Sequence, residues 1–293
     1  MQVASRTNVV YYASLAVLVG GGLAVVAEAA TPVPWYAGLA VSGLVLGLGL
    51  RRSLRRAGAV RRPLPAGVER WMRDTFPYYH WVDRDRFRRD VKIVLDEWIF
   101  EGIDGVEVTD EALAGVVAGA ALLLHGRPRW ELPRRQTVLL YPDRFDLDYF
   151  SGESGDFDGM AHQQGPVILS SRAIKESWSD ATDGSNVVLH ELAHLLDYEN
   201  AFADGVPSLV DPGSQVAWRA LVQKEIRRVR IGRSMLRRYA ATNPAELFAV
   251  AVENFFERPE TMAERHPELF AALKSLFNLD PVGGAAVASA ASR

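Results

Sequence analysis

The sequence predicts an α+β domain that follows a two-helix membrane hairpin. Two uncharged apolar runs, at about residues 7–27 and 31–50, open the chain, and each is long enough to cross a bilayer as a helix. The rest of the chain alternates stretches of helical periodicity with short runs rich in valine, isoleucine and leucine. With 293 residues, 48% of them hydrophobic, the chain can bury a sizeable core.

A turn between the two apolar runs completes the predicted hairpin, which would occupy residues 1–50. Glu28 interrupts the apolar sequence, and the two prolines of Thr31–Pro34 suit a tight connection. The triplet Gly20–Gly22 would weaken the first helix in isolation, but would allow close packing against the second. The alternative is a secretory signal peptide, because Ala27–Ala29 resembles a small-residue cleavage site.

Positive charge is concentrated directly behind the hairpin. Six arginines lie between Arg51 and Arg62, within a predicted basic linker of residues 51–66. Under the positive-inside rule such a cluster stays in the cytoplasm. We therefore expect both ends of the hairpin and the following domain to lie on the cytoplasmic side of a bacterial inner membrane.

The main domain, predicted as residues 67–280, is acidic. Residues 1–62 carry seven arginines and one acid, so the remainder has a net charge of −9 within a total of −3. An acidic domain argues against non-specific nucleic-acid binding. The absence of cysteine excludes a thiol nucleophile, a thiolate metal site and disulfides. The tail, residues 281–293, consists mostly of small residues and is expected to be disordered.

Three helices are predicted between residues 86 and 181 of the main domain. Arg86–Phe100 places apolar residues at helical spacing between charges. A second, buried helix would begin at the capping candidate Thr109 and stop at Gly126. A short third helix is predicted over residues 172–181.

Two strands and one loop are also expected. Gln136–Pro142 and Gly165–Ser171 are short apolar runs bounded by turn residues, which is typical of strands. Between them, Asp146–Gln164 is polar, acidic and rich in glycine, and is interpreted as a loop that could act as a lid.

The stretch Asn186–Tyr198 is predicted to be a helix that carries an H-E-x-x-H motif. Because residues i and i+4 share a helix face, His190 and His194 can direct two imidazole nitrogens at one metal ion. Glu191 lies roughly 100° further around the helix and could take a proton from a water molecule without being a ligand. Three residues are available as the helix cap: Asp183, Ser185 and Asn186.

The other interpretation is a helix that holds two histidines and an acid by chance. Apolar residues flank the motif at Val187–Leu189 and Leu195–Leu196, which predicts a buried helix. Two histidines and a glutamate would be costly in that position unless something organises them. The metal site is therefore the stronger prediction.

A catalytic zinc ion usually has three protein ligands, so a third must come from elsewhere. The candidate is a helix capped by Asn243, with Pro244 as its first residue and Pro259 at its end. Glu246 and Glu253 are seven residues apart and share a face of this helix. Spacing does not choose between them, since Glu246 also fits a capping box and Glu253 could pair with an arginine.

The chain resembles the Mlc titration factor A family of bacterial zinc peptidases, whose catalytic core is similar to the zincin core of anthrax lethal factor. The resemblance extends from about Pro63 to Asp280. It is carried by five blocks in one order, at residues 102–124, 137–145, 165–171, 183–197 and 239–260.

The resemblance implies a zincin-like α+β fold with a small mixed sheet and one Zn²⁺ ion per chain. It assigns the metal to His190, His194 and Glu246, and the general base to Glu191. By the same resemblance Tyr239, seven residues before Glu246, would stabilise the oxyanion. Tyr239 could otherwise be an ordinary half-buried tyrosine.

Three further expectations concern the surroundings of the site. With Glu246 as the ligand, Glu253 would support a ligand from behind. Asp197 could accept a hydrogen bond from a metal-binding histidine, or could simply be an acid at a helix end. The strand Pro166–Ser171, which precedes the motif helix, is expected to offer its edge to an extended peptide.

The function predicted from these features is a membrane-anchored zinc metallopeptidase, with the family leaning towards aminopeptidase activity on short peptides. Its expected partners are a peptide or protein substrate, the membrane and a repressor-like protein regulator, with no nucleic acid. The alternative is a binding module that sequesters a transcriptional repressor or another cytoplasmic protein, with zinc structural or vestigial. The presence of Glu191 favours catalysis. A protease that cuts within the bilayer would need the motif inside an apolar span, which it is not.

Overall fold

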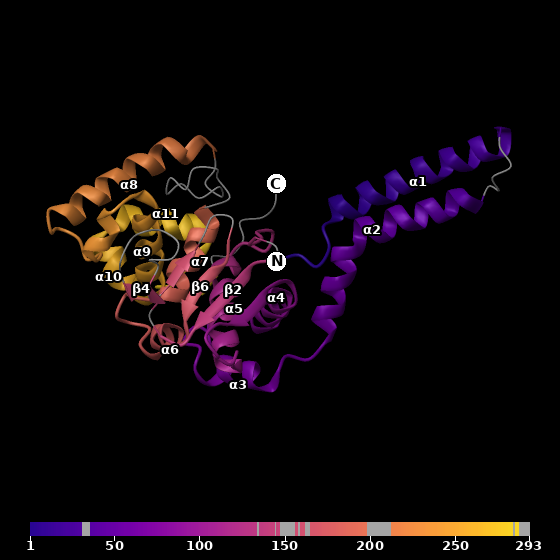
Figure 1. Cartoon of the computed structure of the whole chain (residues 1–293). Helices are drawn as coiled ribbons and strands as arrows, with labels where there is room; N and C mark the ends of the chain where they lie inside the picture. Colours follow the sequence, from indigo (N-terminus) through magenta and orange to yellow (C-terminus); the bar gives the residue numbers. More distant parts are fainter. Residues whose placement is uncertain are drawn as a thin grey trace. The chain divides into compact units, whose positions relative to one another are not determined.

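The computed structural model describes residues 1–30, 36–133, 135–143, 145–146, 156–157, 159–161, 165–197, 212–283 and 285–286. The chain divides into two compact units, Met1–Pro63 and Leu64–Arg293, which Figure 1 colours along the sequence. The second unit combines helices with a small mixed sheet, as the sequence predicts.

The first unit consists of two helices, α1 (Arg6–Ala30) and α2 (Tyr36–Arg61). Both have the length and hydropathy that a membrane span requires. Large apolar side chains point outward, with Val17 70% and Leu18 72% exposed. The basic stretch 51–61, expected within a linker, continues α2 as helix.

Small residues form the contact between α1 and α2. A Cβ atom on Gly20 would collide with the carbonyl oxygen of Gly38 and the hydroxyl of Ser42. The Ser42 hydroxyl donates a hydrogen bond across the pair to the carbonyl oxygen of Ala16, at 2.9 Å. Of the predicted glycine triplet, only Gly20 takes part, since Gly21 and Gly22 face open space. The two backbones therefore approach as small-residue interfaces in membranes do.

The sheet of the second unit has the order β1-β2-β6-β5. β1, β2 and β6 are parallel, and β5 runs antiparallel to β6, with Gly159 opposite Leu169 and Ala161 opposite Val167. The four strands are β1 (Ile99–Gly102), β2 (Thr137–Tyr141), β5 (Gly159–Ala161) and β6 (Val167–Ser170). Two-stranded ladders join β3 (Phe145–Asp146) to β4 (Asp156–Phe157) and β7 (Leu279–Asp280) to β8 (Ala285–Ala286).

Two predictions about this sheet are wrong. β6 is an interior strand, paired on both sides, so it is not the edge expected from Pro166–Ser171. The edge strands are β1 and β5, and β5 lies in the stretch predicted to be a loop. A fully apolar run such as β6 is typical of a strand buried on both faces, whereas a three-residue strand containing glycine carries almost no sequence signal. Apart from β5, Asp146 and β4, the residues of 146–164 lie outside the described residues, as does most of the tail.

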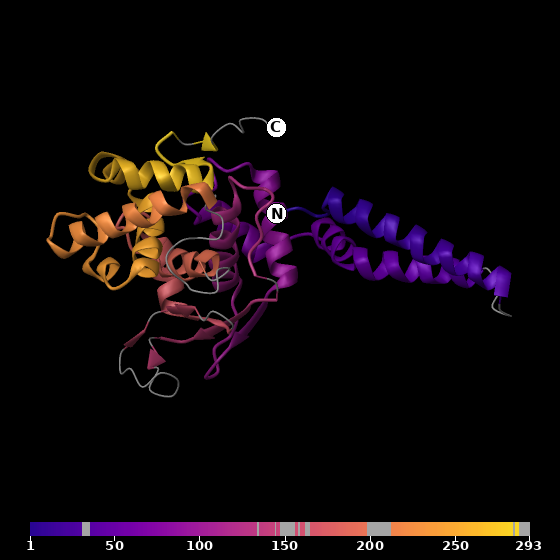
Figure 2. The same cartoon turned by 90° about the horizontal axis from the view of Figure 1, so that it is seen from above.

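Nine α-helices and two 3₁₀ turns are described in the second unit. The α-helices are α3 (Ala66–Asp74), α4 (Arg84–Glu97), α5 (Asp110–Leu124), α6 (Ser171–Ser179), α7 (Val187–Asp197), α8 (Gln215–Arg230), α9 (Pro244–Glu257), α10 (Pro259–Arg265) and α11 (Pro267–Phe277). The 3₁₀ turns are η1 (Pro212–Ser214) and η2 (Arg238–Ala241). The C-terminal helices α8 to α11 contact one another and form one group beside the sheet (Figures 1 and 2).

Side-chain caps fix where three of the helices begin. The side-chain oxygens of Thr109, Asn186 and Asn243 each accept the backbone N–H three residues later, at 3.2, 2.9 and 2.9 Å. The predicted caps Thr109 and Asn243 are thereby confirmed. Of the three candidates before the motif helix, Asn186 is the one that caps it.

Glycines allow the central helix α5 to pack closely against its neighbours. A Cβ atom on Gly115 would lie 2.8 Å from Cγ2 of Ile174 and 3.0 Å from the indole nitrogen of Trp178, both on α6. One turn later, a Cβ atom on Gly119 would lie 3.0 Å from Cγ1 of Val188 on α7. The helix that carries the H-E-x-x-H motif therefore rests directly on α5.

A buried acid on α9 holds the start of α7. Glu257 accepts hydrogen bonds from the side-chain amide of Asn186 and from the backbone N–H of Gly184, both at 3.0 Å. Burial raises the pKa of Glu257 to about 8, although the hydrogen bond from Asn186 opposes this shift. Glu257 is thus largely protonated at neutral pH.

We predict that Gly115→Val destabilises the second unit by about 1–3 kcal/mol, because the added methyl groups overpack the contact between α5 and α6. The measurement is chemical denaturation followed by tryptophan fluorescence. Arg227→Val, on the exposed face of α8, is the matched control and should change stability by only a few tenths of a kcal/mol. Equal stability of the two variants would contradict the described packing.

We predict that Glu257→Gln flattens the pH dependence of stability. In the unfolded chain this acid loses its proton near pH 4.5, but in the folded chain it keeps the proton to about pH 8. Between these values the folded state binds more protons, so the free energy of unfolding falls as pH rises through the window. The wild type should therefore lose stability relative to Glu257→Gln from pH 5 to pH 8.5 in denaturation curves. Parallel pH profiles would show that Glu257 is not held protonated.

Candidate metal centre

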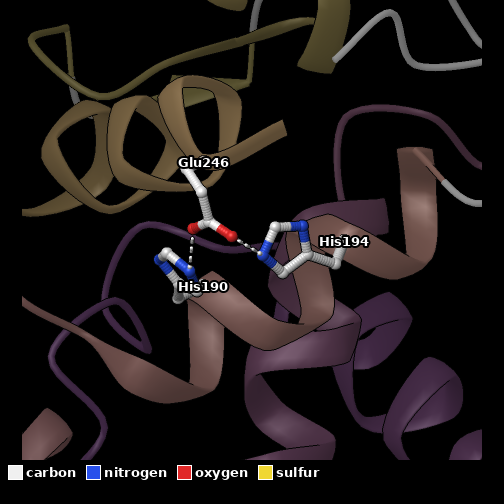
Figure 3. A group of neighbouring side chains, drawn as sticks. All are labelled: His190, His194 and Glu246. Atoms are coloured by element: carbon white, nitrogen blue, oxygen red, sulfur yellow. Dashed lines mark hydrogen bonds and ion pairs between the residues drawn. The ribbon is translucent and has the colours of Figure 1, made fainter. Parts of the chain in front are cut away.

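Three side chains from two helices converge at one point (Figure 3). His190 and His194 lie one turn apart on α7, and Glu246 enters between them from the first turn of α9. Nε2 of His190 is 3.0 Å from one carboxylate oxygen of Glu246, and Nε2 of His194 is 3.6 Å from the other. The three potential ligand atoms lie within 4.8 Å of one another. Among the described residues this is the single group of its kind.

The cap of α9 explains how Glu246 reaches this position. Asn243 accepts the backbone N–H of Glu246, which fixes the first turn of the helix. The carboxylate of Glu246 is turned towards the two histidines. The capping position and the contact with the imidazoles are therefore compatible, although the sequence offered them as alternatives.

The electrostatics of the group favour a cation. Burial alone would lower the pKa of His190, but its hydrogen bonds to Glu246 and Glu253 outweigh burial and raise the pKa to about 10. Burial would raise the pKa of Glu246, but its hydrogen bonds to both histidines hold it far below the usual value. The surrounding carboxylates thus stabilise positive charge between the three side chains. Two imidazoles and one carboxylate are also the donor set of many catalytic zinc sites, so these residues fit a metal ion.

Glu191 lies beside the cluster and is buried. Burial raises its pKa, and the nearby charges of His190 and His194 only partly oppose this rise. The carboxyl group of Glu191 is therefore more basic than that of an ordinary glutamate.

The edge strand β5, next to β6, passes directly against Glu191. A Cβ atom on Gly159 would lie 2.8 Å from Cγ of Glu191 and 2.6 Å from Cγ1 of Val187. Only glycine allows the strand to approach α7 this closely. Sequence reasoning missed Gly159, because a single glycine in an acidic, glycine-rich stretch gives no signal of its own.

Glu253 is fully buried and meets both partners that the sequence offered as alternatives. One oxygen is 2.6 Å from Nδ1 of His190, and the guanidinium of Arg237 contacts both oxygens, at 2.5 and 2.8 Å. The backbone N–H of Asn186 also donates to Glu253, at 2.8 Å. Burial would raise the pKa of Glu253, but the hydrogen bond from His190 and the charge of Arg237 lower it. Sequence reasoning missed Arg237, because no motif marks it.

Tyr239 reaches the site from η2. Its ring centroid lies 6.0 Å from that of His190, and 48% of the residue is exposed. Burial and the nearby charges of Glu246 and Glu191 raise its pKa to about 12. The phenol is therefore protonated at neutral pH and can donate a hydrogen bond.

Other predicted or buried polar residues lie away from the cluster. Asp197 is the last residue of α7 and is fully buried, and its suggested contact with a histidine stays a prediction. His266 pairs with Glu225, at 2.6 Å from Nδ1, and His125 accepts the backbone N–H of Asp83, at 3.1 Å. These two histidines have structural partners of their own.

Comparisons with known proteins agree with this geometry. The family described as glucose-regulated metallo-peptidase M90 matches residues 50–278. Mlc titration factor A of Escherichia coli O1:K1 is 37% identical over 165 residues, and that of Cronobacter sakazakii is 36% identical over 164 residues. An uncharacterized protein of Synechocystis sp., slr2042, is 27% identical over 239 residues, which cover 76% of this chain and 87% of the relative.

The alignments with the two Mlc titration factors cover 50% of this chain and 60% of each relative. The family match is longer and includes the sheet, α7 and α9. The chain therefore belongs to the glucose-regulated metallo-peptidase M90 family, and its predicted kinship with Mlc titration factor A is confirmed.

Proposed function

We propose that the chain is a membrane-anchored zinc peptidase. The observation that carries this proposal is the convergence of His190, His194 and Glu246 within 4.8 Å, with the buried acid Glu191 beside them. Membership of a metallo-peptidase family supports it. Zinc is preferred because two imidazoles and one carboxylate leave a position open for substrate.

In the proposed reaction, the metal ion and the side chains around it have separate roles. A zinc ion held by His190, His194 and Glu246 would polarise the scissile carbonyl group and lower the pKa of water. Glu191 takes a proton from the attacking water molecule and delivers it to the leaving amine. Tyr239 donates a hydrogen bond to the oxyanion that develops on the carbonyl. The raised pKa values of Glu191 and Tyr239 suit these two roles.

We propose that an extended substrate aligns with β5, in place of β6 as expected from the sequence. β5 ends the sheet, and its backbone at Gly159 lies directly against Glu191. A peptide parallel to this strand would bring a scissile bond near the base. The family resemblance favours trimming of short peptides from the amino terminus.

We also propose that unit 1 anchors the domain in the inner membrane, with the domain in the cytoplasm. The length of α1 and α2 and their exposed apolar side chains support the anchor. The arginines between Arg51 and Arg62 support the orientation.

A second candidate function is the binding of a protein regulator. The name of these relatives, Mlc titration factor A, describes a protein that titrates Mlc. In that case the metal cluster would hold a binding surface together, and the loss of Glu191 would not matter.

The test is Glu191→Gln in the full-length chain, purified in detergent. We predict that this variant lowers kcat for peptide hydrolysis by at least about 10²-fold, because the general base is lost, while the zinc content stays at the wild-type level. A peptide library read by mass spectrometry measures cleavage, and metal analysis measures zinc. Glu260→Gln, on the exposed face of α10, should behave as the wild type. Unchanged cleavage by Glu191→Gln would refute the proposed mechanism.

We predict that Gly159→Ala lowers kcat by roughly 10-fold or more with little change in zinc content. The new methyl group would overlap Cγ of Glu191 and displace the base, and small displacements of reacting groups are costly. Gly58→Ala is the matched control, because nothing lies within 4 Å of that position. Full activity of Gly159→Ala would argue against the close approach of β5 to the base.

A further inference from the structure

The proposed mechanism leaves Arg237 without a role, although its guanidinium contacts the buried Glu253 behind the metal cluster. We propose that Arg237 is a positioning residue that holds both a metal ligand, His190, and the oxyanion donor, Tyr239. This inference rests on the proposed function and adds a single side chain that links the two.

The first step is the pair formed by Arg237 and Glu253. The two terminal nitrogens of the guanidinium each meet one carboxylate oxygen, at 2.5 and 2.8 Å. Such a two-pronged contact fixes the plane of the carboxylate as well as its charge. Glu253 is 0% exposed, and an unpaired carboxylate in that position would be strongly destabilising. Arg237 therefore pairs with Glu253 and holds its carboxylate in one orientation.

The second step leads from Glu253 to the metal ligand. The oxygen that contacts Nη2 of Arg237 is also 2.6 Å from Nδ1 of His190. A carboxylate at this distance accepts a hydrogen bond from Nδ1, so Nε2, which faces Glu246, is the nitrogen that would bind a metal ion. Nη2 of Arg237 is itself 3.3 Å from Nδ1 and limits rotation of the ring.

The same carboxylate anchors the motif helix. Its second oxygen accepts the backbone N–H of Asn186, the cap of α7, at 2.8 Å, beside Nη1 of Arg237. One charged pair thus fixes both the start of α7 and the ring of its first histidine. Displacement of Glu253 would consequently move the ligand relative to Glu246.

The third step leads to Tyr239. The central carbon of the Arg237 guanidinium lies 5.9 Å from the centroid of the Tyr239 ring, within the range of a cation–π contact. The centroid of the same ring lies 6.0 Å from that of the His190 ring. The Tyr239 ring is therefore placed beside both the guanidinium of Arg237 and a metal-binding imidazole. Loss of Arg237 would release the phenol as well as the histidine.

A purely structural role makes a different prediction. If Arg237 only neutralised a buried acid, any cation in its place would suffice. Arg237→Lys keeps the charge but loses the two-pronged contact and the planar face towards Tyr239. The neighbouring Arg238 provides a matched control, because it is exposed and has no ion pair among the described residues.

The experiment compares Arg237→Gln, Arg237→Lys and Arg238→Gln in the full-length chain in detergent. Zinc affinity is measured by competition with a chromophoric chelator, and ligand geometry by the visible spectrum after replacement of zinc with Co²⁺. Peptide hydrolysis at saturating zinc gives kcat and KM separately. Thermal unfolding without metal identifies any variant that is not folded.

We expect Arg237→Gln to weaken zinc binding by about 10–100-fold and to alter the Co²⁺ spectrum. At saturating zinc we expect kcat to fall with KM nearly unchanged, because Tyr239 acts on the transition state. Arg237→Lys should lie between this variant and the wild type, and provides the readout if Arg237→Gln does not fold. Arg238→Gln should match the wild type in every measurement.

Wild-type zinc affinity and kcat in Arg237→Gln would overturn the proposal. Wild-type zinc affinity and kcat in Arg237→Lys would also overturn it, because charge neutralisation would then be the whole role of Arg237. A loss of zinc affinity in Arg237→Gln with unchanged kcat at saturating zinc would overturn it as well. A wild type that binds zinc but cleaves no peptide would refute the proposed function, while the zinc affinities of the variants would still decide the link to His190. A wild type that binds no zinc would overturn both.

Discussion

The packing of α7 against α9 buries the carboxylates of Glu253 and Glu257 and partly buries that of Glu246, and it depends on a donor for each of them. Glu246 meets the two histidines, Glu253 meets His190 and Arg237, and Glu257 meets the start of α7. A buried acid without such partners costs several kcal/mol. The two helices can therefore pack in essentially one register, and that register also assembles the site.

The cost of removing each of the three carboxyl groups from water is offset in a different way. Glu257 keeps a proton and accepts hydrogen bonds from neutral amides, whereas Glu253 is ionised against Arg237. Glu246 is ionised against imidazoles that can exchange a proton for a metal ion. Along one face of α9, the acids thus differ in role: Glu257 holds the start of α7, and Glu246 belongs to the candidate metal site. A metal ion bound by these side chains would therefore also stabilise the α7–α9 contact.

The two units of the chain differ in where their polar and apolar side chains lie. In unit 2, polar groups are buried and must be paired, while in unit 1 apolar side chains face outward and small residues line the contact between helices. The first arrangement suits a protein core in water, and the second suits a lipid environment, where helices associate by close backbone approach.

The sequence by itself determined the features that depend on local spacing. The apolar length of α1 and α2, the caps Thr109 and Asn243, and the placement of His190 and His194 on one helix face all follow from the 3.6-residue period and from local hydrogen bonding. The choice between Glu246 and Glu253 was different, because both lie on the same face of α9. Spacing left it open, and the family resemblance selected Glu246.

Only the tertiary structure decided the rest. It brought Glu246 between the imidazoles and Glu253 behind them, replaced β6 by β5 at the edge of the sheet, and added Arg237 and Gly159 to the site. These contacts join segments that are distant along the chain, and nothing in the local pattern of one segment specifies its neighbour in another. The crossing angles of helices and the order of strands are set by the packing of the whole core, so they can be determined only from the folded structure.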